Sequence, residues 1–188
     1  MRKIALLASG SGSNVQNIAE YFRDHTGVEI ALVLTNNLRA GVIDRCQALG
    51  LPLVYASPSG LRQKGWLLGL LQGLDVDFVV LAGWLKMIPE EVVSAYPNAL
   101  VNIHPALLRD YGGHGMYGMK VHEAVKKSGA LQTGISIHWV DELYDNGALI
   151  EQHRVDLSPE DQPEDIAKKV HQLEYVHYPK AIERLLGV

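Results

Sequence analysis

Short apolar runs alternate with helical patterns over the first hundred residues of the chain. The runs contain the aliphatic and β-branched residues that favour buried strands, at Ile4–Ala8, Val28–Thr35, Pro52–Tyr55, Asp77–Ala82 and Leu100–His104. The segments between them predict helices that end near His25, cover Ala40–Leu49 and Leu61–Leu74, and begin at Pro89. Strands that alternate with helices in this way predict parallel βαβ units, with helices on both faces of the sheet.

The last third of the chain departs from this alternation. A short helix is predicted at Val121–Lys127, and two strands, Thr133–Val140 and Ala148–Val155, follow with only an acidic turn between them. Pro163 then opens a final amphipathic helix, Glu164–Leu186. Strands joined by a turn alone predict an antiparallel pair. The sequence therefore predicts an α/β fold with a doubly wound, mostly parallel sheet and an antiparallel pair near the C-terminus.

Composition narrows the class of protein. The chain has 188 residues, 47% of them hydrophobic, without a repeat or linker, so we expect a single domain over residues 1–188. Its net charge of −4 argues against a surface for nucleic acid or for an anionic membrane. The lone cysteine, Cys46, is expected to be a packed thiol in a reducing compartment. No apolar run reaches membrane-spanning length and no signal peptide is recognisable, which predicts a cytoplasmic protein.

The strand Leu100–His104 carries the strongest chemical signal. Asn102 and His104 are two residues apart, so their side chains point to the same side of a predicted buried strand. Burying an amide and an imidazole there costs desolvation unless the groups are used. The pair offers an oxyanion donor and a proton-transfer group at the carboxyl end of a strand, where ligands bind in such sheets. A hydrogen-bonded core histidine beside a turn asparagine is the equally weighted alternative.

A glycine-rich turn follows the first predicted strand. Strand, turn Ser9–Asn14 and helix form a layout that directs backbone N–H groups and a helix N-terminus at an anion. The dinucleotide fingerprint fails because Val15 stands where its third glycine belongs, and no Lys-Ser or Lys-Thr follows, as a P-loop requires. A phosphate cradle remains, and a plain tight turn is almost as probable.

Several motifs in fixed order resemble the formyltetrahydrofolate-dependent formyltransferases. The motifs span most of the chain: Ser9–Asn14, Val80–Gly83, Asn102–Leu108, Gly134–His138, Asp141–Gly147, and Glu174 with Tyr178-Pro179. The resemblance implies formyl transfer from 10-formyltetrahydrofolate as co-substrate, without a metal and without a covalent enzyme intermediate. It also implies a small phosphorylated amine, 5′-phosphoribosylglycinamide, as acceptor, and thus a place in purine synthesis.

The resemblance assigns roles to individual residues. Its catalytic asparagine, histidine and aspartate match Asn102, His104 and Asp145, where the carboxylate would hold a protonated imidazole and could accept the amine's proton. The acceptor's phosphate would bind at Gly12, Ser13 and Asn14, and its amine at Glu174. The residues expected to bind the folate co-substrate are Leu85, Lys86, Met87, Ile88, Asn102, Val140 and Asp141. Core packing is the alternative for Leu85–Ile88.

Some positions depart from the family pattern. Lys86 stands where many members have arginine, and the loop Tyr111–Val121, with four glycines between Gly112 and Gly118, looks longer than in many relatives. We expect the part Tyr111–Met119 to be a mobile cover, with a rigid loop as the alternative. Arg62 is a loosely aligned candidate for the folate tail, and His122 a candidate for the acceptor site.

Other functions remain to be weighed. Methionyl-tRNA, sugar-nucleotide and folate-hydrolysing members of the same family usually carry a further domain, which we do not expect in this chain. A non-catalytic phosphate-binding module would not need Asn102, His104 and Asp145 to converge. A metal enzyme is disfavoured because the eight histidines form no H-x-x-x-H or H-E-x-x-H pattern. We expect small-molecule partners and either a monomer or a homodimer.

Overall fold

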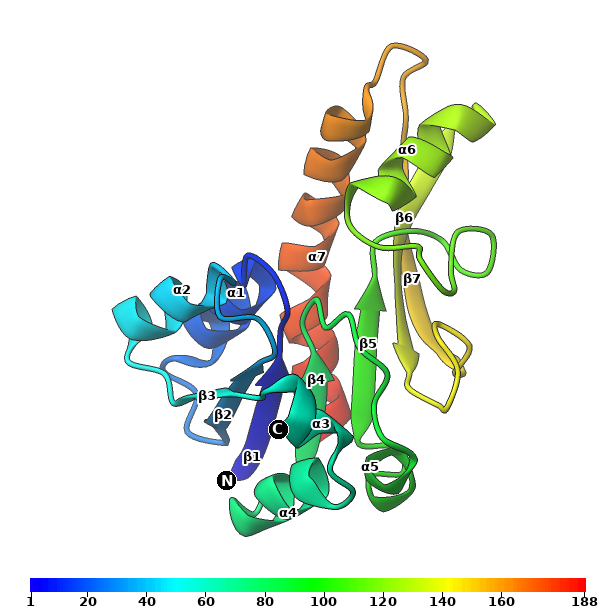
Figure 1. The fold of residues 1–188 in the computed structure, drawn as a ribbon. Coiled ribbons are helices and arrows are strands. Elements are labelled where there is room, and N and C mark those ends of the chain that lie inside the picture. The colour runs from blue at the N-terminus through cyan, green and yellow to red at the C-terminus, as the bar shows by residue number, and fades with distance from the viewer.

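The computed structural model describes all residues 1–188 and is built around one seven-stranded sheet (Figure 1). The strands run in the spatial order β3-β2-β1-β4-β5-β6-β7. Their bounds are β1 (Arg2–Leu7), β2 (Val28–Thr35), β3 (Leu53–Tyr55), β4 (Phe78–Leu81), β5 (Leu100–His104), β6 (Gln132–Trp139) and β7 (Leu149–Asp156). β1 to β5 pair in parallel, whereas β6 is antiparallel to both β5 and β7. The predicted mixed sheet with its antiparallel C-terminal pair is confirmed.

Seven helices connect and cover these strands. They are α1 (Ser13–Phe22), α2 (Val42–Leu49), α3 (Pro58–Arg62), α4 (Trp66–Gly73), α5 (Glu90–Ala95), α6 (Met119–Ser128) and α7 (Pro163–Leu186). The single helix expected over Leu61–Leu74 is wrong, because the chain forms two helices separated at Gln63–Gly65. Gly65 adopts a left-handed φ of 79° there, which interrupts a helix and which a glycine adopts without strain.

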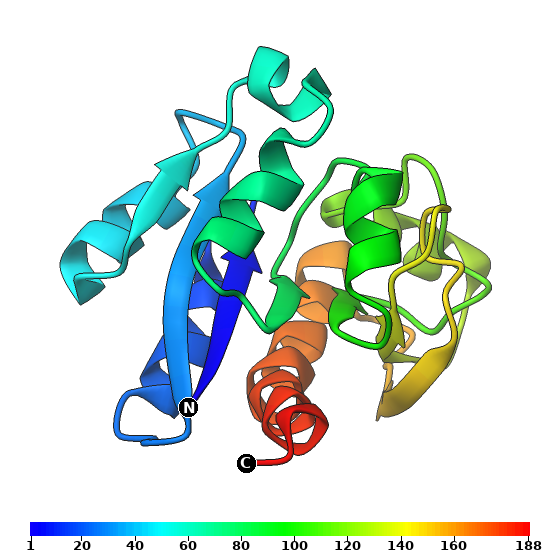
Figure 2. The ribbon, with the colours of Figure 1, turned by 90° about the horizontal axis from the view of Figure 1, so that it is seen from below.

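Both faces of the sheet are buried, as a parallel arrangement requires. Along β1, Ile4 and Leu6 pack into the larger apolar cluster, whereas Ala5 and Leu7 pack into the smaller one on the opposite face. Helices α1, α2, α6 and α7 cover the larger cluster, and α4 and α5 cover the smaller. Figure 2 shows helices on both sides of the strands. Because helices cover both faces of the sheet, a ligand can reach the strands only at their ends.

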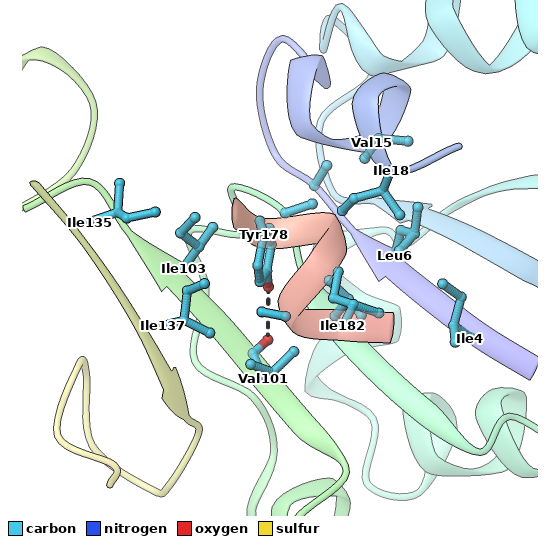
Figure 3. Close-up of a cluster of buried hydrophobic side chains, with 14 of the residues drawn as sticks. Ile4, Leu6, Val15, Ile18, Val101, Ile103, Ile135, Ile137, Tyr178 and Ile182 are labelled. Atoms are coloured by element: carbon cyan, nitrogen blue, oxygen red, sulfur yellow. Dashed lines mark hydrogen bonds between the residues drawn. The ribbon is translucent and has the colours of Figure 1, made fainter. Parts of the chain in front are cut away.

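Helix α7 joins the two halves of the sheet through Tyr178. The Tyr178 side chain is fully buried, and its hydroxyl donates to the Leu81 carbonyl at 2.9 Å. The Val101 carbonyl lies 3.4 Å from the same hydroxyl (Figure 3). Pro179 lies inside the helix and cannot donate to the carbonyl four residues earlier, that of Tyr175. The Asn17 side-chain amide donates to that carbonyl instead, at 2.9 Å. These contacts hold the middle of α7 against α1, β4 and β5.

None of the helices combines the length and the apolar character needed to cross a membrane.

Candidate active site

A cavity of about 790 Å³ opens where strands β1, β2, β4 and β5 end. The loops after β1 and β4 line one side, and the loop after β5 together with the acidic turn 141–147 lines the other. Apart from the loosely aligned candidate Arg62, every site residue predicted from the sequence lines this cavity. These residues are Gly12, Ser13, Asn14, Leu85, Lys86, Met87, Ile88, Asn102, His104, Val140, Asp141, Asp145 and Glu174.

Strand β5 carries Asn102 and His104 to the cavity on one face, as their spacing predicts. Leu100 and Val101 anchor the strand in the core at 2% and 0% exposure. In the antiparallel pairing with β6, Asn102 lies opposite His138 and His104 lies opposite Ser136. Polar side chains of the two neighbouring strands therefore lie opposite one another, which places the Asn102 amide beside the imidazoles of His104 and His138.

Asp145 reaches this cluster from the acidic turn. Its Oδ2 lies 3.4 Å from His104 Nδ1 and accepts the Gly113 N–H at 3.0 Å. Its Oδ1 lies 3.4 Å from Asn102 Nδ2 and 3.6 Å from His138 Nε2. Burial raises the pKa of this carboxyl, but the contacts with His104 and the Gly113 N–H outweigh burial and hold it well below its usual range. The side chain is therefore a fixed anion beside two imidazoles.

The loop after β5 fixes the orientation of His104. Nε2 of this ring lies 2.7 Å from the Tyr111 carbonyl, so Nε2 carries a proton and donates it. Nδ1 then faces Asp145. A ring protonated on both nitrogens would donate on both sides, which is the arrangement that stabilises an imidazolium. The backbone at Tyr111 and Gly113 thus positions both His104 and Asp145.

His138 belongs to the cluster, although sequence reasoning did not assign it to the site. Its Nδ1 lies 2.8 Å from the Trp139 carbonyl and donates to it, so Nε2 is left to accept the Asn102 amide at 3.1 Å. The ring is 2% exposed. Its position on a buried strand, two residues after the buried Ser136, is the signal that could have identified it. His138 therefore orients the asparagine amide.

The opposite wall of the cavity begins at the glycine turn. Gly12 precedes α1 with a φ of 77°, and an added Cβ would lie 2.6 Å from Val42, so a side chain has no room there. No side chain caps the N-terminus of α1, which leaves the first N–H groups of the helix open to an anion. An open helix N-terminus of this kind is what a phosphate cradle needs, and phosphate binding at this turn stays a prediction.

Glu174 lies beside this turn on α7. It is 5% exposed, and its Oε2 accepts the Asn14 side-chain amide at 3.1 Å. Burial raises the pKa of Glu174 to about 7, against the opposing effects of Asn14 and His104. No cationic side chain of the protein pairs with it. A buried carboxylate without a cation forms a site for a positively charged ligand group.

Apolar residues form the third wall. Leu85 and Met87 are each 44% exposed and face the cavity, whereas Ile88 is 6% exposed and packs into the smaller apolar cluster. Core packing, the alternative for Leu85–Ile88, therefore holds for Ile88 but not for its neighbours. In the acidic turn, Asp141 accepts the Leu143 N–H at 2.9 Å and the Asn146 amide at 2.7 Å, which shapes the turn that carries Asp145.

Three further expectations concern Arg62, Cys46 and the extended loop. Arg62, on α3, does not contribute to the lining of the cavity. Cys46 is 1% exposed and burial raises the pKa of its thiol to about 11, so the expectation of a packed thiol is confirmed. The extended loop does line the cavity, through His114, Met116 and Tyr117.

Gly112 offers a test of the loop contacts. An added Cβ would lie 2.4 Å from Leu108 Cδ2 and 3.2 Å from Asp145 Cβ. We expect Gly112→Ala to displace Asp145 and to lower kcat by about 10-fold, because catalytic groups tolerate only small displacements. Gly69→Ala is the matched control, since no atom lies within 4 Å of its added Cβ on α4. That variant should keep full kcat and unfold at a slightly higher temperature. Unchanged kcat in Gly112→Ala would show that the loop does not constrain Asp145.

Comparison with known proteins places this geometry in a family. The sequence pattern of the formyl transferase family matches residues 2–182. Phosphoribosylglycinamide formyltransferase of Bacillus subtilis is 31% identical over 193 residues, which cover 100% of this chain and 96% of the relative. The chloroplastic phosphoribosylglycinamide formyltransferase of Arabidopsis thaliana is 39% identical over 187 residues, 96% of this chain and 64% of the relative. This chain spans less than two thirds of the plant relatives it matches.

A solved structure agrees with the fold as well. The crystal structure of phosphoribosylglycinamide formyltransferase from Streptococcus pneumoniae matches with a TM-score of 0.86 at 33% sequence identity. The match covers 98% of this chain and 99% of that chain. The similarity therefore extends over the whole sheet and the cavity beside it.

Proposed function

This chain belongs to the formyl transferase family, and we propose that it transfers the formyl group of 10-formyltetrahydrofolate to the amine of 5′-phosphoribosylglycinamide. The products would be formyl-phosphoribosylglycinamide and tetrahydrofolate, a step of purine synthesis. The observation that carries the proposal is the single cavity that holds Asn102, His104 and Asp145 on one side and Gly12 and Glu174 on the other. Such a cavity can hold a formyl donor and a phosphorylated amine together.

Asn102 and His104 would stabilise the transition state. Attack of an amine on the formyl carbon gives a tetrahedral centre with a negative oxygen and a positive nitrogen. The 3.4 Å contact between Asn102 Nδ2 and Asp145 is long for a hydrogen bond, so this amide hydrogen is available to the oxygen. A donor of this kind is worth roughly 10²–10³ in rate. Protonated His104 would donate to the same oxygen and later pass its proton to the leaving nitrogen of the folate.

Asp145 and Glu174 would each stabilise a different positive charge, Asp145 that of the His104 imidazolium and Glu174 that of the acceptor's nitrogen. Asp145 stays ionised because its pKa lies well below the usual range, so we assign to it the binding of the His104 imidazolium. That same low pKa argues against Asp145 as the group that accepts the amine's proton. Glu174 would bind the amine of the acceptor and attract the positive charge that develops on its nitrogen during attack. Because burial raises the pKa of Glu174 to about 7, this carboxylate could also accept the proton that the attacking nitrogen loses.

The folate would lie along the apolar wall. Exposed Leu85 and Met87 offer the apolar surface that a flat heterocycle requires, and the backbone of Val140 and Asp141 offers polar groups for its edge. Lys86, also in the lining, presents a single ammonium charge rather than the planar fork of an arginine. A cytoplasmic location, a single domain, closure of the loop, and the monomeric or dimeric state stay predictions. The plant relatives carry the word chloroplastic in their names.

A formyl-transfer assay tests the proposal. Purified protein, 10-formyltetrahydrofolate and a panel of amines should give fastest turnover with 5′-phosphoribosylglycinamide. The dephosphorylated acceptor should bind at least about 100-fold more weakly, because it lacks the charge-assisted contacts at the Gly12 turn. Faster formylation of methionyl-tRNA or of an amino sugar nucleotide would overturn the choice of acceptor. Absence of transfer to any amine would favour a phosphate-binding module without catalysis.

A further inference from the structure

His122 lines the cavity, and one of its ring nitrogens has no hydrogen-bond partner. It occupies the first turns of α6, is 2% exposed, and lines the cavity together with His104 and Glu174. Its Nδ1 is buried and has no hydrogen-bond partner. Buried polar atoms in folded proteins are nearly always hydrogen-bonded, so an unsatisfied imidazole at the wall of a cavity indicates a missing ligand group.

The ring of His122 stays uncharged under ordinary conditions. Burial, together with repulsion from the neighbouring His171 and His104, lowers its pKa to about 4. Glu174, the carboxylate that shares the cavity, is one turn beyond His171 on α7. A neutral imidazole has one nitrogen with a free lone pair, which accepts a hydrogen bond. His122 can therefore accept a hydrogen bond, and its uncharged ring does not repel a positively charged donor group.

Its neighbours define where such a donor would lie. His104, His122 and Glu174 all line the same cavity, and His104 acts electrostatically on both of the others. One boundary of that space is the proposed site of the formyl carbon, near Asn102 and His104. The other boundary is the carboxylate proposed to attract the acceptor's amine.

We infer that His122 binds the acceptor's amine, accepting a hydrogen bond from its N–H through a neutral ring nitrogen. This inference rests on the proposed function and adds a residue to the acceptor site. Glu174 supplies the attraction for the charge, while His122 supplies direction. Two hydrogen-bond acceptors, His122 on α6 and Glu174 on α7, restrict the orientation of the amine more than the carboxylate of Glu174 alone. The amine lone pair can thereby be directed toward the formyl carbon.

The alternative is a histidine retained for packing alone, and stability separates the two. His122→Leu replaces an unsatisfied buried polar group with an apolar one of similar size. If His122 serves binding, the variant should unfold at the same temperature as the wild type or up to about 4 °C higher. A clear fall in the unfolding temperature would support the packing role and contradict the proposed role in binding.

Binding supplies the decisive test. Calorimetry would compare 5′-phosphoribosylglycinamide with its acetamide analogue, in which hydrogen replaces the amine. We expect His122→Leu to weaken binding of the amine about 10- to 100-fold and binding of the analogue less than about 3-fold. Losses of equal size for both compounds, or none for either, would overturn the inference. Nitrogen-15 resonances of the His122 ring should also shift with the amine and not with the analogue.

His153→Leu is the matched control. His153 also has a buried ring nitrogen without a hydrogen bond of good geometry, although Glu151 Oε1 lies 3.3 Å from it. The ring stacks on His177 and does not line the cavity. This variant should bind both compounds as the wild type does. If the wild type itself bound neither compound, the proposed function would fall and this inference with it. Tight wild-type binding with an unselective His122→Leu variant would overturn the inference alone.

Discussion

Replacing His104 with alanine should lower kcat by roughly 10³-fold while KM for either substrate changes by less than about 3-fold. The imidazole is 3% exposed and held between the Tyr111 carbonyl and Asp145, so its contribution is made to the transition state and not to substrate binding. Steady-state kinetics with both substrates varied would separate the two constants.

Two further variants make this result interpretable. Asp145→Asn should also reduce kcat strongly, because it keeps the shape of the side chain but removes the anion that faces His104. His25→Ala should leave kcat unchanged, since His25 lies outside the cavity and accepts the Gly27 N–H. Thermal unfolding would identify any loss of folded protein in His104→Ala. Near-normal turnover in a folded His104→Ala variant would remove the basis for the catalytic cluster.

Replacing Glu174 with glutamine should stabilise the protein and weaken acceptor binding at the same time. Burial raises the pKa of Glu174 from 4.5 to about 7, so the folded state holds this proton more tightly than the unfolded chain. The stability associated with the protonated form is fully present below pH 4.5 and is lost as the pH rises through about 7. At pH 8 the buried carboxylate therefore costs about 3 kcal/mol, which the glutamine variant recovers.

Urea unfolding between pH 4 and pH 8 would measure this effect. The wild type should lose stability across that range relative to Glu174→Gln, and the difference should approach zero near pH 4. Glu123→Gln, at an exposed position on α6, should follow the wild type throughout. In binding assays, Glu174→Gln should weaken binding of the phosphorylated amine about 10- to 100-fold and leave binding of the folate nearly unchanged. Equal stability of Glu174→Gln and wild type at pH 8 would show that the carboxylate is not desolvated in solution.

The sequence determined the order and type of most secondary structure, because two-sided burial leaves a direct pattern. Strands such as β2 and β5 are apolar runs bounded by turn residues, and their bounds agree with the prediction. The break between α3 and α4 was missed, because leucines continue at helical spacing across Gly65 and outweigh one glycine in the pattern. Pairing of β6 with β5 also depended on tertiary packing, since no local signal specifies which strand the C-terminal pair joins.

The sequence also determined which face of β5 carries chemistry, because Asn102 and His104 have the same parity along a strand. Asp145 was placed by resemblance, and no spacing rule joins it to His104, 41 positions earlier. His138 became a site residue only in the tertiary structure, whereas His122 was a candidate from the resemblance and the structure showed its burial beside the cavity. Local sequence encodes periodicity and thus faces, whereas long-range pairing and helix packing decide which faces meet. The register that sets Asn102 opposite His138, and the packing of α6 that buries His122 beside the cavity, are properties of the folded chain alone.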